Sequence, residues 1–117
     1  MDIEKKQQLC LLADKQIELC KEYGKARVAS GKAKTDLDIL LVANLTEIRQ
    51  GRKSIGYEMA VLTLMENNTT AQHLYREYKE QEARYKGLEK LADAHGSKLI
   101  LEQSMMKRDE QGEKRGY

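Results

Sequence analysis

The 117-residue chain contains no proline, and this absence constrains its fold more than any other feature. Proline breaks helices and is common in turns, so a chain without it suits long helices better than a loop-rich fold. Charged residues make up 34% of the chain, as long solvent-exposed helices tolerate. All six aromatic residues are tyrosines, so a thick core built around Trp or Phe rings is not expected. The sequence therefore predicts an all-α protein with thin helical packing.

Apolar or small residues recur mostly at steps of three and four through the first half of the chain, and the polar Gln16 fills the one wide gap. They are Leu9, Leu12, Leu19, Cys20, Tyr23, Ala26, Ser30, Ala33, Leu37, Leu41, Leu45 and Ile48. This spacing places them on one face of a helix, so one long helix over residues 3–50 is predicted, with Gly31 as the place for a kink. In the alternative, Thr35 and Asp38 cap a second helix.

A turn is predicted after this helix, because Gly51 stands where a glycine commonly ends a helix. Ser54 is then placed to cap a short helix over residues 55–66. In that helix Met59, Leu62 and Met65 are expected to share the apolar face.

The last predicted helix covers residues 70–108 and is capped by Thr69 or Thr70. Its apolar stripe, at heptad spacing, consists of Leu74, Tyr78, Tyr85, Leu88, Ala92, His95, Leu99 and Met106. The tail, residues 109–117, has no apolar stripe and is expected to fray.

Together these elements predict a single domain, residues 1–117, built as a long antiparallel, coiled-coil-like helical hairpin with a short middle helix. Residues near position 45 should face residues near position 74. Two helices cannot cover every apolar side chain, and those expected to stay uncovered are Leu40, Val42, Ile100, Leu101 and Met105. Uncovered apolar surface of this extent predicts a homo-oligomer.

Nothing in the sequence indicates catalysis. The two histidines, His73 and His95, lie roughly 33 Å apart on the predicted last helix, too far to act together. No phosphate-binding loop, nucleophile elbow, dinucleotide fingerprint or zinc-protease motif occurs. Cys10 and Cys20 have no partners at metal-site spacing and are expected to be reduced core residues. We therefore expect no enzymatic activity, no cofactor and no metal.

Positive charge gathers in the middle of the chain, although the formal net charge is only +2. Residues 21–53 carry eight cations and four acids. The candidate nucleic-acid-binding residues are Arg49, Arg52, Lys53, Lys25, Arg27, Lys32 and Lys34. Arg49, Arg52 and Lys53 could bind a phosphate beside a helix N-terminus; the alternative is an ordinary solvent-exposed turn that binds no ligand. With the four cations of the preceding helix, they would form a basic strip that contacts a nucleic-acid backbone.

Tyr75 lies beside Arg76 and Lys79 on the predicted last helix. An aromatic ring among cations is suited to stacking on a nucleic-acid base, whereas the alternative is an ordinary surface tyrosine.

The N-terminus begins with charged residues and lacks the apolar stretch that a signal peptide needs. The longest strictly apolar run, residues 39–43, is far shorter than a membrane span. A soluble cytoplasmic protein without membrane contact is therefore expected.

Within residues 51–111, Lys53 and Ser54 lie in a basic turn, and Tyr78, Tyr85, Leu88 and Glu89 lie on the helix that follows. In this pattern the segment resembles small helical proteins encoded by phages and prophages, in which a long helix and a basic turn precede a tyrosine-containing helix and a closing basic stretch. The layout is also similar to that of the T4-type recombination mediator, a small helical protein that oligomerises and helps to load recombinase on single-stranded DNA.

This resemblance implies a non-enzymatic phage-type accessory protein in the cytoplasm of the host cell. Such a protein would self-associate and contact single-stranded DNA or a recombination or replication protein. The alternative is a protein-binding inhibitor or adaptor that acts on a host protein through an exposed helical surface, without binding nucleic acid.

Overall fold

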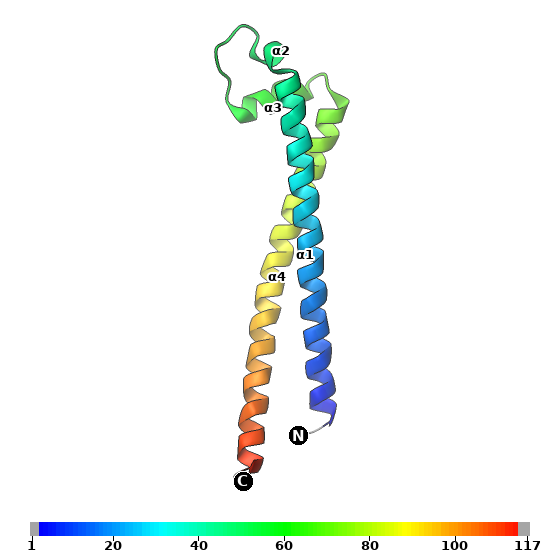
Figure 1. Ribbon diagram of the computed structural model, residues 1–117, viewed down its shortest axis with the longest axis vertical. Helices are drawn as coiled ribbons and strands as arrows, with labels where there is room; N and C mark the ends of the chain where they lie inside the picture. Colours follow the sequence, from blue (N-terminus) through cyan, green and yellow to red (C-terminus); the bar gives the residue numbers. More distant parts are fainter. Residues whose placement is uncertain (1–2, 115–117) are drawn as a thin grey trace. The chain divides into compact units, whose positions relative to one another are not determined.

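A computed structural model describes the backbone of residues 3–114 and the side chains of residues 3–112. The described chain is all-α, with helices α1 (Ile3–Ala43), α2 (Leu45–Arg49), α3 (Tyr57–Met65) and α4 (Thr69–Lys114) (Figure 1). It divides into two compact units. Unit 1 joins the first part of α1, up to Gly24, to the part of α4 from Tyr85 onward, and unit 2 spans Lys25–Arg84.

In each unit α1 and α4 run antiparallel. In unit 1 the rings of Tyr23 and Tyr85 meet edge to face, with centroids 6.0 Å apart. In unit 2 the hydroxyl of Ser30 donates a hydrogen bond to the carbonyl of Tyr78, 3.2 Å away. The predicted antiparallel helical hairpin with a short middle helix is thus confirmed, and oligomerisation stays a prediction.

The first predicted helix, residues 3–50, is in fact two helices. α1 continues through Gly24 and Gly31, but Asn44 interrupts it with φ −112° and ψ 14° before α2 begins. The side-chain amide of Asn44 donates to the carbonyl of Leu40 at 2.8 Å and so occupies a backbone acceptor beside the interruption. Asparagine favours such local bonds over a regular helix, which gives the interruption a physical reason.

The connection after α2 is a turn, as predicted, and Gly51 adopts the positive φ (83°) that glycine accepts without strain. Gln50 also has a positive φ (51°), which no sequence signal indicated.

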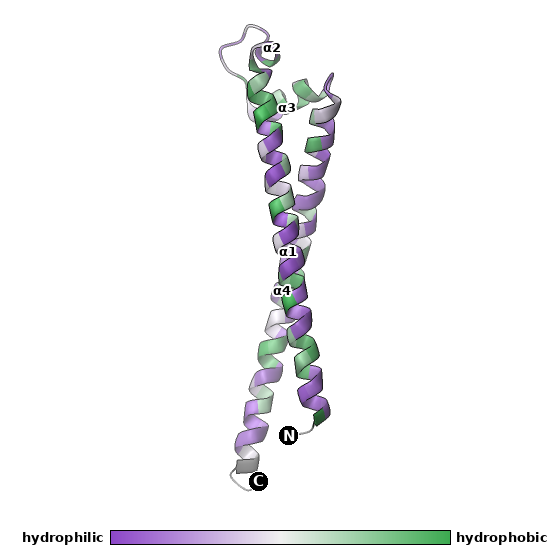
Figure 2. Cartoon of the chain, turned by 45° about the vertical axis from the view of Figure 1, so that its right-hand side comes forward, coloured by the Kyte–Doolittle hydropathy of each residue, from purple (hydrophilic) through white to green (hydrophobic). Residues whose placement is uncertain are grey.

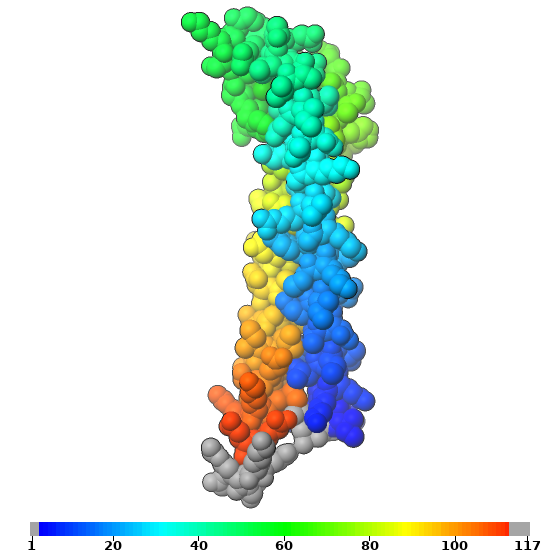
Figure 3. Space-filling view, viewed as in Figure 1, coloured from blue at the N-terminus to red at the C-terminus, as the bar shows by residue number. Residues whose placement is uncertain are grey.

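The core of unit 2 is one cluster, formed by Leu37, Leu41, Ile48, Ala60, Val61, Leu64 and Ala71. Leu37 lies at its centre and is completely buried. Leu74 packs against the cluster, so residues near position 45 do meet residues near position 74. Figure 3 shows the green side chains of α2 and α3 packed on the cyan end of α1.

The middle helix differs from its prediction in its start and in its buried face. α3 begins at Tyr57 after Gly56, with no side-chain cap, so Ser54 does not cap it. Its buried residues are Ala60, Val61 and Leu64, whereas Met59 and Leu62, predicted to face the core, are exposed. Because α3 is apolar on all sides, its periodicity does not determine which side faces the core.

The cap of α4 is Asn68 rather than a threonine: its side-chain oxygen accepts a hydrogen bond from the backbone N–H of Ala71 at 2.9 Å. The helix then continues to Lys114, past the predicted end at Arg108. Residues 109–114 are thus helical and extend α4 beyond its predicted end, whereas the fraying of this tail stays a prediction; residues 115–117 lie outside the described part of the chain.

Unit 1 has very little core. Among its described residues only Leu19 and Ala92 are buried apolar side chains. The facing residues of α4 follow the predicted stripe, with Leu88, His95, Leu99 and Met106 half-buried. In Figure 2, hydrophobic and hydrophilic segments alternate along both long helices.

A polar contact fixes how the two helices of unit 1 pair. The amide nitrogen of Gln16 donates to the carbonyl of Ala92 at 3.0 Å, and its amide oxygen lies 2.9 Å from Nδ1 of His95. Gly96 makes room for this side chain, since a Cβ there would lie 3.2 Å from the Gln16 nitrogen. Gln16 is half-buried, and a polar residue inside a helical seam favours one register, because a shift would leave it without these partners.

Two burial predictions need correction. Cys10 and Cys20 are free thiols, but they are exposed instead of belonging to the core, because each follows a residue of the packed face by one position. Leu40 is half-buried against the unit 2 cluster, whereas Val42, Ile100, Leu101 and Met105 are uncovered as predicted. No helix in residues 3–114 is long and apolar enough to cross a membrane.

Candidate partner-binding surfaces

Unit 2 contains a concave site of about 560 Å³ that collects half of the chain's tyrosines. Lys34 comes from α1, Tyr57 and Leu62 from α3, and Tyr75, Tyr78 and Lys79 from α4. We call these six residues the tyrosine pocket. It forms because α3 lies across α1 and α4 within this unit and brings Tyr57 to the two tyrosines that α4 carries one turn apart.

On the α4 side of the pocket, Lys79 lies over two rings. Its ammonium is 4.8 Å from the ring centroid of Tyr78 and 5.8 Å from that of Tyr75, within cation–π range. The same ammonium lies 3.6 Å from a carboxylate oxygen of Glu82. Desolvation lowers the pKa of Lys79, but Tyr78 and Glu82 outweigh this effect and leave the pKa above the usual lysine value.

On the α3 side, the hydroxyl of Tyr57 donates a hydrogen bond to Asp38 at 3.0 Å. Partial burial of the phenol and this bond to a carboxylate raise the pKa of Tyr57 to about 12, since both disfavour a second negative charge. Lys34 lies 5.8 Å from the Tyr57 centroid and 3.9 Å from Asp38. Both pocket lysines therefore already have a carboxylate neighbour.

All seven predicted nucleic-acid-binding residues lie in unit 2, but they do not share one face. Residues seven apart on a helix lie on the same side, and residues two apart point to nearly opposite sides. Lys25 and Lys32 therefore lie on one side of α1, and Arg27 and Lys34 on another, and all four are exposed.

The cations of the predicted turn are also dispersed. Arg49, at the end of α2, is half-buried, and its Nε is buried without a hydrogen-bond partner within the described chain. Arg52 and Lys53 are exposed in the connection between α2 and α3. Only Lys34 of the predicted set lines the tyrosine pocket.

The sequence indicated Tyr75, with Lys79 nearby, as a ring suited to stacking, but it did not indicate that Tyr57 and Tyr78 would join it in one pocket. The spacing of Tyr75 and Tyr78 was a usable local signal, because residues three apart on a helix are neighbours. No such signal existed for Tyr57, which reaches the pocket only through the packing of α3.

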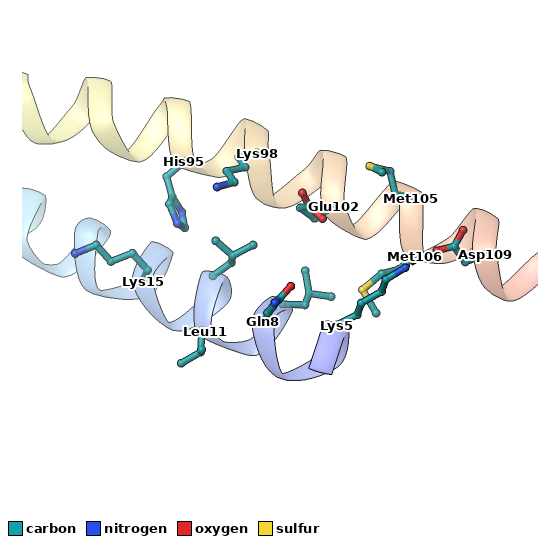
Figure 4. Close-up of a pocket in the computed structure, with 12 residues that line it drawn as sticks. Lys5, Gln8, Leu11, Lys15, His95, Lys98, Glu102, Met105, Met106 and Asp109 are labelled. Carbon is teal, nitrogen blue, oxygen red and sulfur yellow. Dashed lines mark ion pairs between the residues drawn. The ribbon is translucent and has the colours of Figure 1, made fainter. Parts of the chain in front are cut away.

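A second concave surface, of about 500 Å³, lies between the two helices of unit 1. Leu9, Leu12 and Met106 contribute apolar side chains, and Lys98, Glu102 and Lys15 contribute charges. In Figure 4, His95 and Met106 are directed toward α1, whereas Leu11 and Met105 point away from the facing helix. An ion pair between Lys5 and Asp109, 3.7 Å, spans the two helices near the chain ends. We call this surface the unit 1 groove.

In the part of the chain that the structure describes, no three His, Cys, Asp or Glu side chains gather to hold a metal ion. Comparisons with protein-family models, curated proteins and solved structures found no significant match to this chain. The resemblance to phage-encoded helical proteins and to the recombination mediator therefore stays a prediction from the sequence.

Proposed function

We propose that this chain is a non-enzymatic interaction protein that self-associates through unit 1 and binds a partner protein with unit 2. The observation that carries the proposal is the distribution of large apolar side chains. Among the described residues thirteen are exposed, from Ile3 to Met105, whereas only six of the buried core residues are larger than alanine.

This imbalance is concentrated in unit 1, where Leu19 is the one large apolar side chain that is buried among the described residues. Seven others are exposed there: Ile3, Leu11, Ile17, Leu91, Ile100, Leu101 and Met105. Burying a Leu, Ile or Met side chain contributes roughly 1.5–3 kcal/mol, so a second helical layer would stabilise this unit substantially. Long helices derive most of their stability from such packing.

For unit 2, a protein partner fits the tyrosine pocket better than a phosphate backbone does. Tyrosine and methionine are enriched where proteins bind one another, and Met59 and Leu62 lie exposed on the helix that supplies Tyr57. Lys34 and Lys79 already lie near carboxylates, so they contribute little net positive charge to attract a phosphate.

Light scattering over a range of protein concentrations, at low and high salt, tests the self-association. The expected result is a mass that rises above 13.5 kDa with concentration and is nearly indifferent to salt, because apolar burial is not screened. The matched variant is Ile100→Ser with Leu101→Ser, which removes exposed apolar side chains only. A monomer at every concentration refutes the proposal.

A second candidate function is contact with single-stranded nucleic acid, and the specific observation in its favour is the group of three tyrosine rings in one concave site. Bases stack on such rings with little sequence preference. Arg52 and Lys53, both exposed in the segment that leads into α3, would supply the backbone contacts.

Fluorescence anisotropy of labelled single-stranded DNA tests this candidate, with Tyr75→Leu and the Arg52→Ala/Lys53→Ala pair as variants. Binding that weakens with salt and is lost in both variants supports nucleic-acid contact. Absence of binding at low salt eliminates it and leaves the protein partner.

A further inference from the structure

The part of α4 in unit 1 carries two apolar seams side by side. The packed seam, which faces α1, consists of Leu88, Ala92, His95, Leu99, Glu102 and Met106. The open seam consists of Leu91, Ala94, Lys98, Leu101, Met105 and Arg108, each outside the core. The exposed fractions of Leu91, Leu101 and Met105 are 58%, 59% and 50%.

Both seams follow the alternating steps of three and four that mark a helix–helix contact. A helix that packs against one neighbour needs only one such seam, whereas a helix inside a bundle carries a wider apolar face. The width of the apolar face of α4 therefore matches a bundle with more helices than unit 1 possesses.

The open seam borders the unit 1 groove, which is where an additional helix has room to lie. Lys98 and Met105 line the groove, and Leu11 of α1 lies exposed at its other edge. Gly87 and Gly112 continue the spacing of the seam at its two ends, and a Cβ at either would meet no atom within 4 Å. A second helix would meet no obstacle from these positions.

We propose that the open seam binds the open seam of a second copy of this chain, with the two α4 helices antiparallel and residue i opposite residue 199 − i. This inference rests on the self-association in the proposed function and gives it a surface and a register. Ala94 then lies opposite Met105 of the second copy, Lys98 opposite Leu101, and Leu91 opposite Arg108. The arrangement is two-fold symmetric, so the contact closes at two chains.

Charge decides the orientation. A parallel pairing would place Lys98 against Lys98 and Arg108 against Arg108 inside the contact, where like charges repel. The antiparallel register instead brings Lys98 beside Leu101 and Glu102 of the second copy. Each lysine then packs its aliphatic stem on a leucine and reaches a carboxylate with its ammonium.

Cross-linking tests the register on the full chain, in a background with Cys10→Ser and Cys20→Ser. One variant carries Ala94→Cys and another Met105→Cys, and both positions are exposed. Mixing the two under mild oxidant should give a cross-linked dimer, whereas each variant alone should give little. In a dimer of the Ala94→Cys variant alone, the two thiols would be separated by eleven positions, about 16 Å along the helix, too far for a disulfide. Gln103→Cys, outside the seam, is the control.

The results distinguish a failure of the proposed register from a failure of the proposed self-association. Cross-linking of each variant with itself shows parallel pairing and overturns the inference. A dimer by light scattering that yields no mixed cross-link places the contact elsewhere, which overturns the seam but leaves the proposed self-association. A chain that stays monomeric overturns both.

Charge substitutions at Leu101 provide a second test that does not depend on oxidation. Leu101→Lys places a cation opposite Lys98 of the second copy, and Leu101→Glu places an anion there. Leu101 is exposed, so neither substitution should change the helical content measured by circular dichroism. The lysine variant should dimerise at least about tenfold more weakly than the glutamate variant. Equal affinities contradict the proposed register.

Discussion

Substitution of Leu37 by alanine should destabilise unit 2 more than any comparable change on α1. Leu37 is completely buried at the centre of the unit 2 cluster, whereas Ile39, two residues further along α1, is 61% exposed. A buried Leu→Ala change loses the transfer free energy of the removed atoms and leaves a cavity, which together cost about 3 kcal/mol. We take a value in the lower half of the usual range because a thin core can relax into the gap.

That loss is large relative to the stability available. Unit 2 spans Lys25–Arg84, and at roughly 0.1 kcal/mol per residue its free energy of unfolding is about 6 kcal/mol. Leu37→Ala should therefore remove about half of it, which urea denaturation followed by circular dichroism measures directly. Ile39→Ala is the matched control and should change the stability by less than about 0.5 kcal/mol. If the two variants unfold at the same urea concentration, the assignment of the core is wrong.

Tyr57→Phe should remove a tyrosine that ionises well above pH 10 in a spectrophotometric alkaline titration. Because the folded pKa of Tyr57 is raised to about 12, the stability from this phenol is present below pH 10 and is lost as the pH rises toward 12. Asn68→Ala should cost about 1 kcal/mol of thermal or urea stability by removing the α4 cap, whereas the exposed neighbour Asn67→Ala should cost little. Gly31→Ala should stabilise α1 by up to about 1 kcal/mol, because the added Cβ meets open space. Gly96→Ala should stabilise the protein less or destabilise it, because its Cβ would lie 3.2 Å from the Gln16 side chain. Equal gains of the two variants in thermal denaturation would contradict the packing of unit 1.

Long-range periodicity made most of the fold predictable. The stripes that include Leu37 on α1 and Ala92 on α4 repeat over many turns, so their buried faces were identified correctly apart from the exposed Cys20. Short elements were less predictable, because few residues determine them. Nothing in the spacing marked Asn44 as an interruption, and α3, with apolar residues on every side, gave no indication that Val61 and not Leu62 would be buried.

The candidate sites show a different limit. The basic set was chosen by closeness in sequence, but Arg27 and Lys25 lie on different sides of one helix, which is a consequence of helical geometry that a count of charges ignores. The tyrosine pocket needed tertiary structure, because Tyr57 joins Tyr75 from another helix. The open seam, by contrast, was partly predictable from the sequence, because Leu101 was predicted to stay uncovered.

Hydrogen exchange measured at low and high protein concentration shows whether unit 1 completes its core by association. Amides exchange slowly only where packing holds the helix closed. If unit 1 associates, protection along α4 near Leu101 rises with concentration, while protection around Leu37 in unit 2 stays constant. Equal protection near Leu101 at both concentrations would contradict the association of unit 1.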